Sequence, residues 1–263
     1  MLFSAGMGIG VLFWSVAEPL THFHNPPAGA GDTAAAAQEA MTITLWHWGL
    51  HGWAVYVVVG LALAYYSHRR GMPLTLRSML QPILGRFTKG AAGHAVDIFA
   101  VIGTMFGVAT TLGLGAQQVN SGLAHLFQIG ISTTTQLLLI AFFTAAAAIS
   151  VVSGLDRGIR ILSVTTVYLA LGLFAYLLLT GPTTVALSAI VKGTAQYGLA
   201  LVQNALWTDF GGSKKWQGNW SLFYWGGWIA WSPFVGMFIA RISRGRTIRE
   251  FVLGVLLVPT ALS

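Results

Sequence analysis

The chain has 263 residues, of which 55% are hydrophobic and only 8% charged, against roughly 25% charged residues in soluble proteins. This composition excludes an ordinary soluble domain and predicts an all-α polytopic membrane protein that has the lipid bilayer as its solvent. Because the chain has no cysteine, disulfides, thiolate metal sites and cysteine nucleophiles are excluded as well.

Long apolar segments follow one another along the chain, each near or above the roughly 20 residues that a helix needs to cross a bilayer. They cover residues 1–20, 43–66, 95–126, 135–152, 161–179 and 220–240. Residues 21–40 are expected as an external loop or short helix. Residues 183–206 carry apolar side chains at helical spacing, which predicts an amphipathic external helix or, as the alternative, an ordinary surface helix packed on the bundle.

Basic residues cluster in alternate connections between these segments. Eleven of the fourteen follow the second, fourth and sixth segments: Arg69, Arg70, Arg77, Arg86, Lys89, Arg157, Arg160, Arg241, Arg244, Arg246 and Arg249. The other three, Lys192, Lys214 and Lys215, share one connection on the opposite side. The positive-inside rule places the three basic connections in the cytoplasm, so the net charge of +7 reports topology and not a nucleic-acid partner.

Two of the apolar segments carry residues that weaken a helix. These are Gly6, Gly8 and Gly10 in the first segment, and Gly226, Gly227 and Pro233 in the sixth. Paired interrupted helices mark the substrate and ion site of inverted-repeat transporters, because unwound backbone exposes carbonyl and amide groups there. The sequence therefore predicts two broken helices at a binding site. The alternative is that the glycines serve close helix packing.

Tryptophans in the sixth segment provide a chemistry for that site. Trp225, Trp228 and Trp231 recur at every third residue, which predicts one stripe whose ring faces attract a quaternary ammonium or another soft cation. The alternative is an aromatic belt at the membrane surface. That alternative suits Trp216 and Trp220, which lie beside polar residues, better than Trp228 and Trp231.

Several motifs belong together in one known pattern. They are Gly-Met-Gly-Ile-Gly at 6–10, Ala-Glu-Pro at 17–19, His-Trp-Gly-Leu-His-Gly-Trp at 47–53, Gly-Thr-Met-Phe-Gly at 103–107, and the stretches 220–238 and 241–250. Through them the whole chain resembles the betaine/carnitine/choline transporter family.

The resemblance implies a LeuT-like inverted-repeat transporter fold of twelve spans in the bacterial plasma (inner) membrane, assembled as a homotrimer. This chain would hold spans three to eight and the start of nine in one transporter domain. Residues 1–180 would form the first inverted repeat, 183–206 the external helix and 219–263 the start of the second repeat. Since the apolar run 251–263 is too short to cross a bilayer, we expect a partial chain.

The resemblance also implies which side chains bind the substrate. The family's aromatic box would comprise Trp48, Trp53 and Tyr56 from the fourth span and Trp228 and Trp231 from the eighth. A third tryptophan of the betaine carriers is replaced here by Gly227.

Gly10 bears on the charge of the substrate, since choline carriers of the family have an aspartate at this position. A glycine cannot neutralise a permanent cation, which favours a zwitterion such as glycine betaine. Its carboxylate can bind backbone amides while its trimethylammonium lies between aromatic rings.

For coupling ions, the resemblance implies carbonyls of Ser4 and Met7 at one sodium site and Thr104 with Phe234 at a second. Val108 stands where the family has a threonine, so the second site has lost a hydroxyl. No organic cofactor is expected.

The leading hypothesis is therefore a sodium-coupled carrier, not an enzyme, for a quaternary ammonium zwitterion such as glycine betaine, working by alternating access. Alternatives are a choline, carnitine or ectoine carrier of the same family, or a fragment that does not transport.

A remote alternative is a membrane haem or metal enzyme, since His47 and His51 have i, i+4 spacing. The simpler interpretation is that both histidines pack beside the aromatic box. Glu18 is expected to cap a helix or lie at a rim, and Asp97 to be a helix-terminal charge or part of a gating ion pair.

The charge bias predicts that Arg77, Arg157 and Arg246 lie in the cytoplasm while Lys214 is external. Since the chain has no cysteine, single cysteines at these positions can be labelled cleanly with a membrane-impermeant thiol reagent. Each is expected to react only from its assigned side. Labelling of positions 77 and 214 from the same side would contradict this topology.

Overall fold

A computed structural model describes residues 2–152, 160–207 and 214–262. These residues form helices and turns with no strand among them, which confirms the all-α prediction. The chain divides into two compact units: one comprises Met1–Ala17 with Val108–Gly198, the other Glu18–Gly107 with Leu199–Ser263. Arg157, predicted in a cytoplasmic connection, lies outside the described residues.

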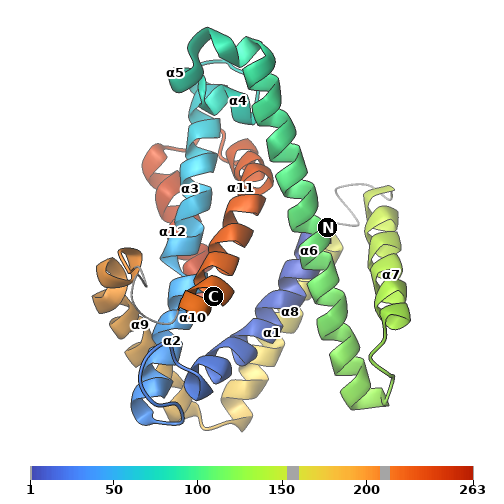
Figure 1. The fold of residues 1–263 in the computed structure, drawn as a ribbon, viewed down its shortest axis with the longest axis vertical. Coiled ribbons are helices and arrows are strands. Elements are labelled where there is room, and N and C mark those ends of the chain that lie inside the picture. Colours follow the sequence, from blue (N-terminus) through green and yellow to red (C-terminus); the bar gives the residue numbers. More distant parts are fainter. Residues whose placement is uncertain (1, 153–159, 208–213, 263) are drawn as a thin grey trace. The chain divides into compact units, whose positions relative to one another are not determined.

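The described helices cover the predicted apolar segments over their described residues, except at Gly49 and Trp220, and Figure 1 labels the α-helices. In chain order they are α1 (Leu2–His24), α2 (Ala34–Trp48), α3 (Leu50–Ala64), the π-helix η1 (Tyr65–Arg69), α4 (Leu76–Met79), α5 (Gln81–Leu84), the 3-10 helix η2 (Gly85–Lys89), α6 (Ala91–Phe127), α7 (Thr133–Val152), α8 (Arg160–Thr180), α9 (Thr183–Ala205), α10 (Lys214–Asn219), α11 (Ser221–Ile242) and α12 (Ile248–Leu262).

Length and apolar composition suit three of the described helical stretches for crossing a bilayer: Ala34–Arg69, Ala91–Phe127 and Thr183–Ala205. The first two contain predicted spans. The third is α9, which matches the predicted helix 183–206 in extent, and its external position stays a prediction.

Residues 21–40, expected as an external loop or short helix, are helical except at 25–33. Helix α1 continues through Pro19 to His24, and α2 already begins at Ala34. The Thr33 hydroxyl caps α2 by accepting a hydrogen bond from the Ala36 amide at 3.0 Å. The alanines that follow the cap are strong helix formers, which explains the early start.

The prediction of two broken helices is wrong, since α1 and α11 are continuous through their glycines. Glycine costs only about 1 kcal/mol in a helix, whereas an unpaired backbone group in an apolar environment costs several kcal/mol. Pro233 cannot donate to the Ile229 carbonyl four residues earlier. The Ser232 hydroxyl donates to that carbonyl instead, at 2.8 Å, so the polar group is satisfied within α11.

A helix break occurs at Gly49, between α2 and α3. Gly49 has φ −88° and ψ −144°, outside the helical region, while its amide still donates to the Leu45 carbonyl at 2.7 Å. The predicted span 43–66 is therefore two helices, and the break directly follows Trp48. It places an irregular backbone beside one of the predicted site residues.

Helices α3 and α11 lie side by side in the second unit (Figure 1) and approach closely at a pair of glycines. A methyl group at Gly236 would lie 2.8 Å from Val59 Cγ1 and 3.3 Å from the Gly60 nitrogen. Small residues at such a crossing let two backbones pack closely. Next to it lies an apolar core of Leu63, Ala64, Ala240 and Phe251.

The end of α11 is fixed by donors from two elements. The carbonyl of Ala240 accepts the Ser243 hydroxyl at 2.8 Å and pairs with His68 Nε2 at 2.8 Å. His68 belongs to η1, so this bond ties the end of α3 to the end of α11. It satisfies a helix-terminal carbonyl that would otherwise lack a partner.

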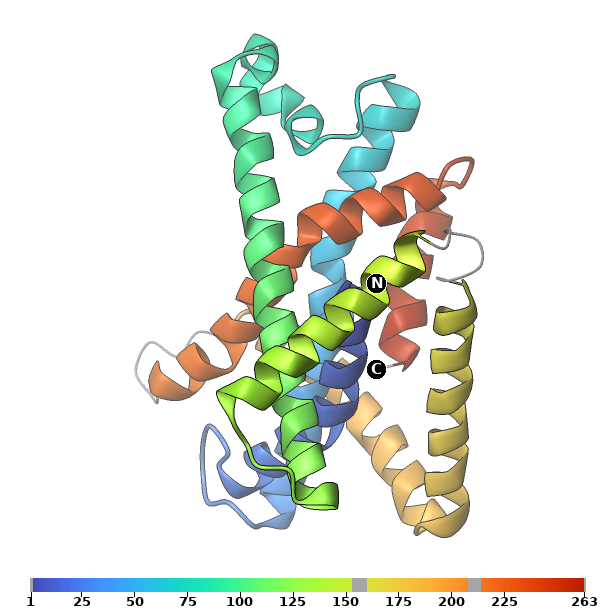
Figure 2. The ribbon, with the colours of Figure 1, turned by 90° about the vertical axis from the view of Figure 1, so that its right-hand side faces the viewer.

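An ion pair connects the short helices to the start of α6. Figure 2 shows α4 and α5 on the path between α3 and α6. Asp97 accepts the Arg77 backbone amide at 3.0 Å and pairs with the Arg77 guanidinium at 3.1 Å. Asp97 is thus half of an ion pair that orders this connection, and a role in gating stays a prediction.

The first unit has one notable buried polar group. Asn120 is fully buried, and its side chain donates to the Gly130 carbonyl at 3.3 Å and accepts from the Ser132 amide at 3.2 Å. These bonds fix the connection between α6 and α7.

Gly236→Ala is expected to destabilise the native protein by about 1–3 kcal/mol, because the added methyl group overpacks the α3–α11 crossing. Gly254→Ala in α12 is the matched control, since a methyl group there meets nothing within 4 Å. Thermal unfolding in detergent measures both variants. Equal stability of the two would contradict the close packing at Gly236.

Candidate functional site

Three aromatic side chains meet around Trp228. The ring centroid of Trp228 lies 5.0 Å from that of Tyr56, 5.2 Å from Trp53 and 6.2 Å from Trp48, and each pair is steeply inclined. Trp48 ends α2, Trp53 and Tyr56 lie on α3, and Trp228 lies on α11. We call these four residues the aromatic cluster. The structure thus brings together four of the five predicted box residues.

Two local features hold Trp228 in this position. Its indole nitrogen donates to the His47 carbonyl at 3.1 Å, near the end of α2. Gly52 provides the space for the ring, since a methyl group at Gly52 would lie only 2.6 Å from Trp228 Cε2. The sequence motif contained Gly52 but indicated no role for it.

The three tryptophans of the predicted stripe do not line one common surface, because each packs against different residues. Trp225 packs against Trp46, with ring centroids 5.5 Å apart. Trp231 packs against Phe234 at 6.3 Å and beside Gly107 of α6. A three-residue spacing drifts around a helix of 3.6 residues per turn, which explains the division. The buried face of α11 instead follows Tyr224, Trp228, Trp231 and Val235.

Both glycines that bear on substrate choice have open surroundings. A methyl group at Gly227 meets nothing within 4 Å, and one at Gly10 approaches only Trp14, at 4.0 Å. A Cβ atom at either position is therefore accommodated within its own unit of this structure.

The predicted sodium ligands are spread over three helices. Ser4 and Met7 lie in the continuous part of α1, Thr104 in α6 and Phe234 in α11. The Thr104 hydroxyl donates to the Ala100 carbonyl at 2.9 Å, which leaves its oxygen lone pairs available. The sodium assignments stay predictions.

Glu18 lies at the centre of a polar network and not at a rim, so its expected position is wrong. The residue is fully buried. One carboxylate oxygen, Oε1, lies 2.5 Å from His47 Nδ1 and 3.3 Å from His22 Nε2. The other, Oε2, accepts the Trp48 indole N–H at 2.8 Å and the Tyr224 hydroxyl. We call these five residues the Glu18 hub.

Burial of Glu18 is possible because each carboxylate oxygen has two partners. A carboxylate without donors would be prohibitively costly in an apolar interior. His22 lies one helical turn from Glu18, but the other partners come from α2 and α11. A signal for Glu18 was present in the sequence, since an ionisable residue within a membrane segment is a functional-site candidate by default.

Aromatic rings cover the histidines of the hub. His47 stacks on Tyr224 with centroids 4.5 Å apart, and His22 lies 4.5 Å from Trp220 and 5.2 Å from Trp216. His47 Nε2 also lies 3.3 Å from the Ser221 hydroxyl. The interpretation of His47 as a packed histidine beside the aromatic box is thereby confirmed.

Glu18, His22 and His47 are of the residue types that bind divalent metals, and their ligand atoms lie within 4.8 Å of one another. The 2.5 Å separation between Glu18 and His47 is that of a hydrogen bond. Two ligands bound to one ion at about 2.1 Å lie roughly 3 Å apart or more in tetrahedral geometry. The arrangement therefore fits shared protons better than a metal ion.

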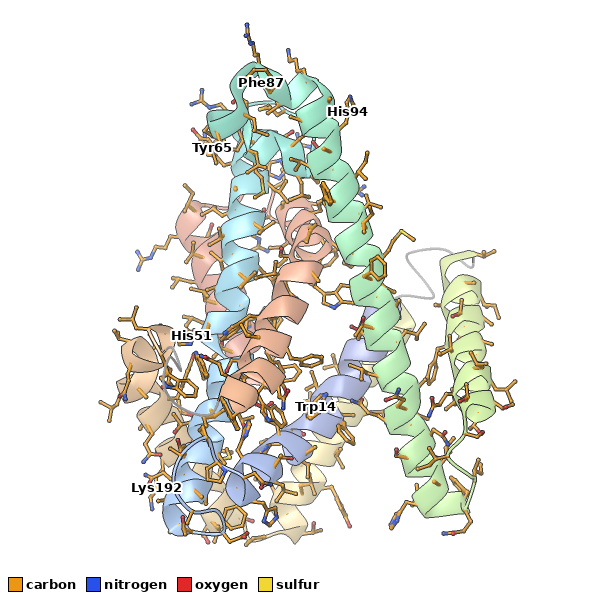
Figure 3. The ribbon with its side chains drawn as sticks, viewed as in Figure 1. Trp14, His51, Tyr65, Phe87, His94 and Lys192 are labelled. Carbon is orange, nitrogen blue, oxygen red and sulfur yellow. The ribbon has the colours of Figure 1, made fainter. Side chains whose placement is uncertain are left out.

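The paired-histidine hypothesis loses its geometric basis. The break at Gly49 separates His47 on α2 from His51 on α3, so the two do not share one helix. Figure 3 places His51 near the junction of these helices. His51 is half-buried, and its side chain interacts with the backbone of Leu201.

The family model described as betaine/carnitine/choline family transporter matches residues 1–263. The chain belongs to this family. It is 52% identical over 98% of its length to the high-affinity choline transport protein of Escherichia coli K12, of which it covers 38%. It is 47% identical over 99% to a glycine betaine transporter of Acinetobacter baylyi, covering 39%, and 46% identical over 100% to the glycine betaine transporter OpuD of Bacillus subtilis, covering 52%.

As a member of the betaine/carnitine/choline transporter family, the chain is part of a multi-pass membrane protein, in agreement with its apolar helices. It spans between 38% and 52% of the length of these three relatives. The aromatic cluster and the Glu18 hub both lie in the second unit, on α1, α2, α3 and α11.

Proposed function

We propose that this chain is the substrate-binding part of a secondary active carrier for a quaternary ammonium compound. Transport proceeds by alternating access, and no covalent bond is made or broken. The observation that carries this proposal is the convergence of Trp48, Trp53, Tyr56 and Trp228 from α2, α3 and α11. Trp231, one turn further along α11, is proposed as a fifth contact.

Aromatic rings suit this substrate class for a physical reason. A trimethylammonium group carries a charge but has no N–H to donate, so ordinary hydrogen-bond acceptors do not recognise it. The faces of tryptophan and tyrosine rings attract such a cation electrostatically and also bury its methyl groups. A cluster of several rings therefore provides both the electrostatic attraction and the apolar contact with the methyl groups.

Within this class we propose a zwitterion such as glycine betaine as the preferred substrate. The relatives named above carry either choline or glycine betaine in their names at similar identity, so overall identity does not select one. The support comes from Gly10, which provides no carboxylate at the position where choline carriers of the family have an aspartate. Choline, carnitine and ectoine are the alternative substrates.

We also propose that sodium drives the uptake and that the native protein is a homotrimer with the LeuT-like repeat arrangement. Residues 1–180 would form the first repeat and 219–263 the start of the second, within the bacterial inner membrane. Thr104 supports a sodium site through its available lone pairs, with Phe234 as the second residue of that site. Ser4 and Met7 would contribute carbonyls if α1 unwinds locally, since carbonyls within a regular helix already accept hydrogen bonds.

Trp228→Ala in the native protein should weaken glycine betaine binding by roughly 30-fold, since a desolvated cation–ring contact contributes about 2 kcal/mol. Phe238→Ala is the control, because Phe238 lies exposed on the same helix. Uptake of labelled glycine betaine into proteoliposomes with and without a sodium gradient measures both transport and coupling. A parent protein that takes up none of the quaternary ammonium compounds would contradict the proposed function. Equal uptake with and without the sodium gradient would contradict only the proposed sodium coupling.

Substitutions at the two glycines are expected to change substrate choice in separable ways. Gly10→Asp should admit choline, because the new carboxylate balances its permanent charge. Gly227→Trp should favour compact glycine betaine over carnitine or ectoine, because an indole fills the open space there. Competition of labelled glycine betaine uptake by choline, carnitine and ectoine measures both effects. An unchanged competition order in both variants would exclude these glycines from the site.

A further inference from the structure

Trp48 belongs both to the aromatic cluster and to the Glu18 hub. Its ring centroid lies 6.2 Å from that of Trp228. Its indole N–H donates to Glu18 Oε2 at 2.8 Å and lies 3.2 Å from the Tyr224 hydroxyl oxygen. The edge of the ring is therefore held by the hub, while the ring itself packs in the cluster.

The backbone around Trp48 does not by itself fix this ring. Trp48 is the last residue of α2, and the next residue, Gly49, leaves the helical conformation. The preceding turn of α2 limits the rotamers of Trp48, but no helical turn follows on its C-terminal side to pack against the ring. The hydrogen bond to a buried carboxylate supplies the missing restraint, because charge-assisted hydrogen bonds are about twice as strong as neutral ones.

A second connection runs from Glu18 to Trp228. The Trp228 indole nitrogen donates to the His47 carbonyl at 3.1 Å, and the His47 ring lies 2.5 Å from Glu18 Oε1. Glu18 thus holds the side chain of the residue whose carbonyl anchors Trp228. The two carboxylate oxygens act on different rings of the cluster, one directly and one through His47.

We propose that Glu18 is a positioning residue of the substrate site: its buried carboxylate orients Trp48 directly and Trp228 through His47. The proposal rests on the proposed function, in which the cluster binds a quaternary ammonium group. It differs from a purely structural role, in which Glu18 would only join α1, α2 and α11. In that case loss of its charge would change the amount of folded protein but not the affinity of the protein that folds.

The test combines Glu18→Gln with two tryptophan substitutions. Glu18→Gln keeps the side-chain volume, but its amide has one acceptor oxygen and cannot serve both donor pairs of the hub. Trp48→Phe removes the indole N–H that Glu18 accepts. Trp53→Phe is the matched control, since it makes the same ring change in the same cluster where the indole nitrogen is buried without a hydrogen-bond partner.

Glu18→Gln and Trp48→Phe are each expected to weaken glycine betaine affinity by about tenfold. The maximal uptake rate per folded carrier should change by less than about twofold, because a misplaced ring affects binding before translocation. The Glu18→Gln/Trp48→Phe double variant should bind no more weakly than the poorer single variant, since both changes remove one restraint. In the Glu18→Gln/Trp53→Phe double variant, the fold loss of affinity should instead equal the product of the two single fold losses.

Two results in these measurements would overturn the proposal. One is an unchanged affinity in folded Glu18→Gln protein. The other is multiplication of the two effects in the Glu18→Gln/Trp48→Phe double variant. Absence of binding and uptake in the parent would instead contradict the proposed function, and the two failures are thereby distinguished.

A ligand-free measurement tests the restraint itself. The indole N–H signal of Trp48 in the nuclear magnetic resonance spectrum is assigned by its loss in Trp48→Phe. Its exchange with solvent deuterium should accelerate at least about tenfold in Glu18→Gln, because the charged acceptor is gone. The Trp53 signal should change less. Equal exchange of the Trp48 signal in parent and variant would overturn the role of Glu18 whether or not a substrate is found.

Discussion

A fully buried carboxylate dictates how the second unit is organised. Glu18 can stay in an apolar interior only if donors surround it, since a buried charge without partners costs several kcal/mol. Its partners come from α1, α2 and α11, on residues far apart in the sequence. Each of these helices must therefore have the register that brings its donor to Glu18. The positions of the aromatic rings on α2 and α11 follow from that requirement.

Glycines make this arrangement sterically possible. Gly49 breaks the helix after Trp48, Gly52 leaves room for the Trp228 indole, and Gly236 lets α11 approach α3. None of these roles needs an unwound helix at the glycine-rich segments. In α11 the Ser232 hydroxyl donates to the Ile229 carbonyl, which Pro233 leaves without an amide donor. The helix therefore stays regular, and so does the face of α11 that carries the aromatic residues. A regular helix holds Trp228 more rigidly than an unwound segment would.

An indole has an N–H edge, which donates hydrogen bonds, and a ring face, which attracts cations. In this structure the two parts of the ring have different partners. The N–H edge of Trp48 faces Glu18, and the N–H edge of Trp228 faces the His47 carbonyl. With these positive edges occupied, a cation that enters the cluster would meet the negative ring faces, which is the geometry that cation–ring attraction requires. The proposed carrier function and the proposed role of Glu18 both depend on this division.

The sequence by itself determined the membrane class, the helical segments, the family and the identity of the aromatic residues. Hydropathy, periodicity and motifs are local or pairwise patterns, and they are sufficient for these conclusions. Helix continuity was mispredicted at Gly6, Gly8, Gly10 and in α11, because backbone hydrogen bonding in an apolar environment outweighs the low helix propensity of glycine. The same local reasoning could not locate the break at Gly49.

The tertiary structure showed that four of the five predicted box residues meet, and it alone showed what holds them. Trp231 and Trp225 matched the three-residue pattern, yet Trp48, Trp53 and Tyr56 are the residues that surround Trp228. Glu18 lies 29 residues from His47 and 206 from Tyr224, so its hub depends on packing between distant helices. Hydrogen-bond partners at such separations leave no periodic signal in a single chain, and for this reason the buried centre of the site was visible only in three dimensions.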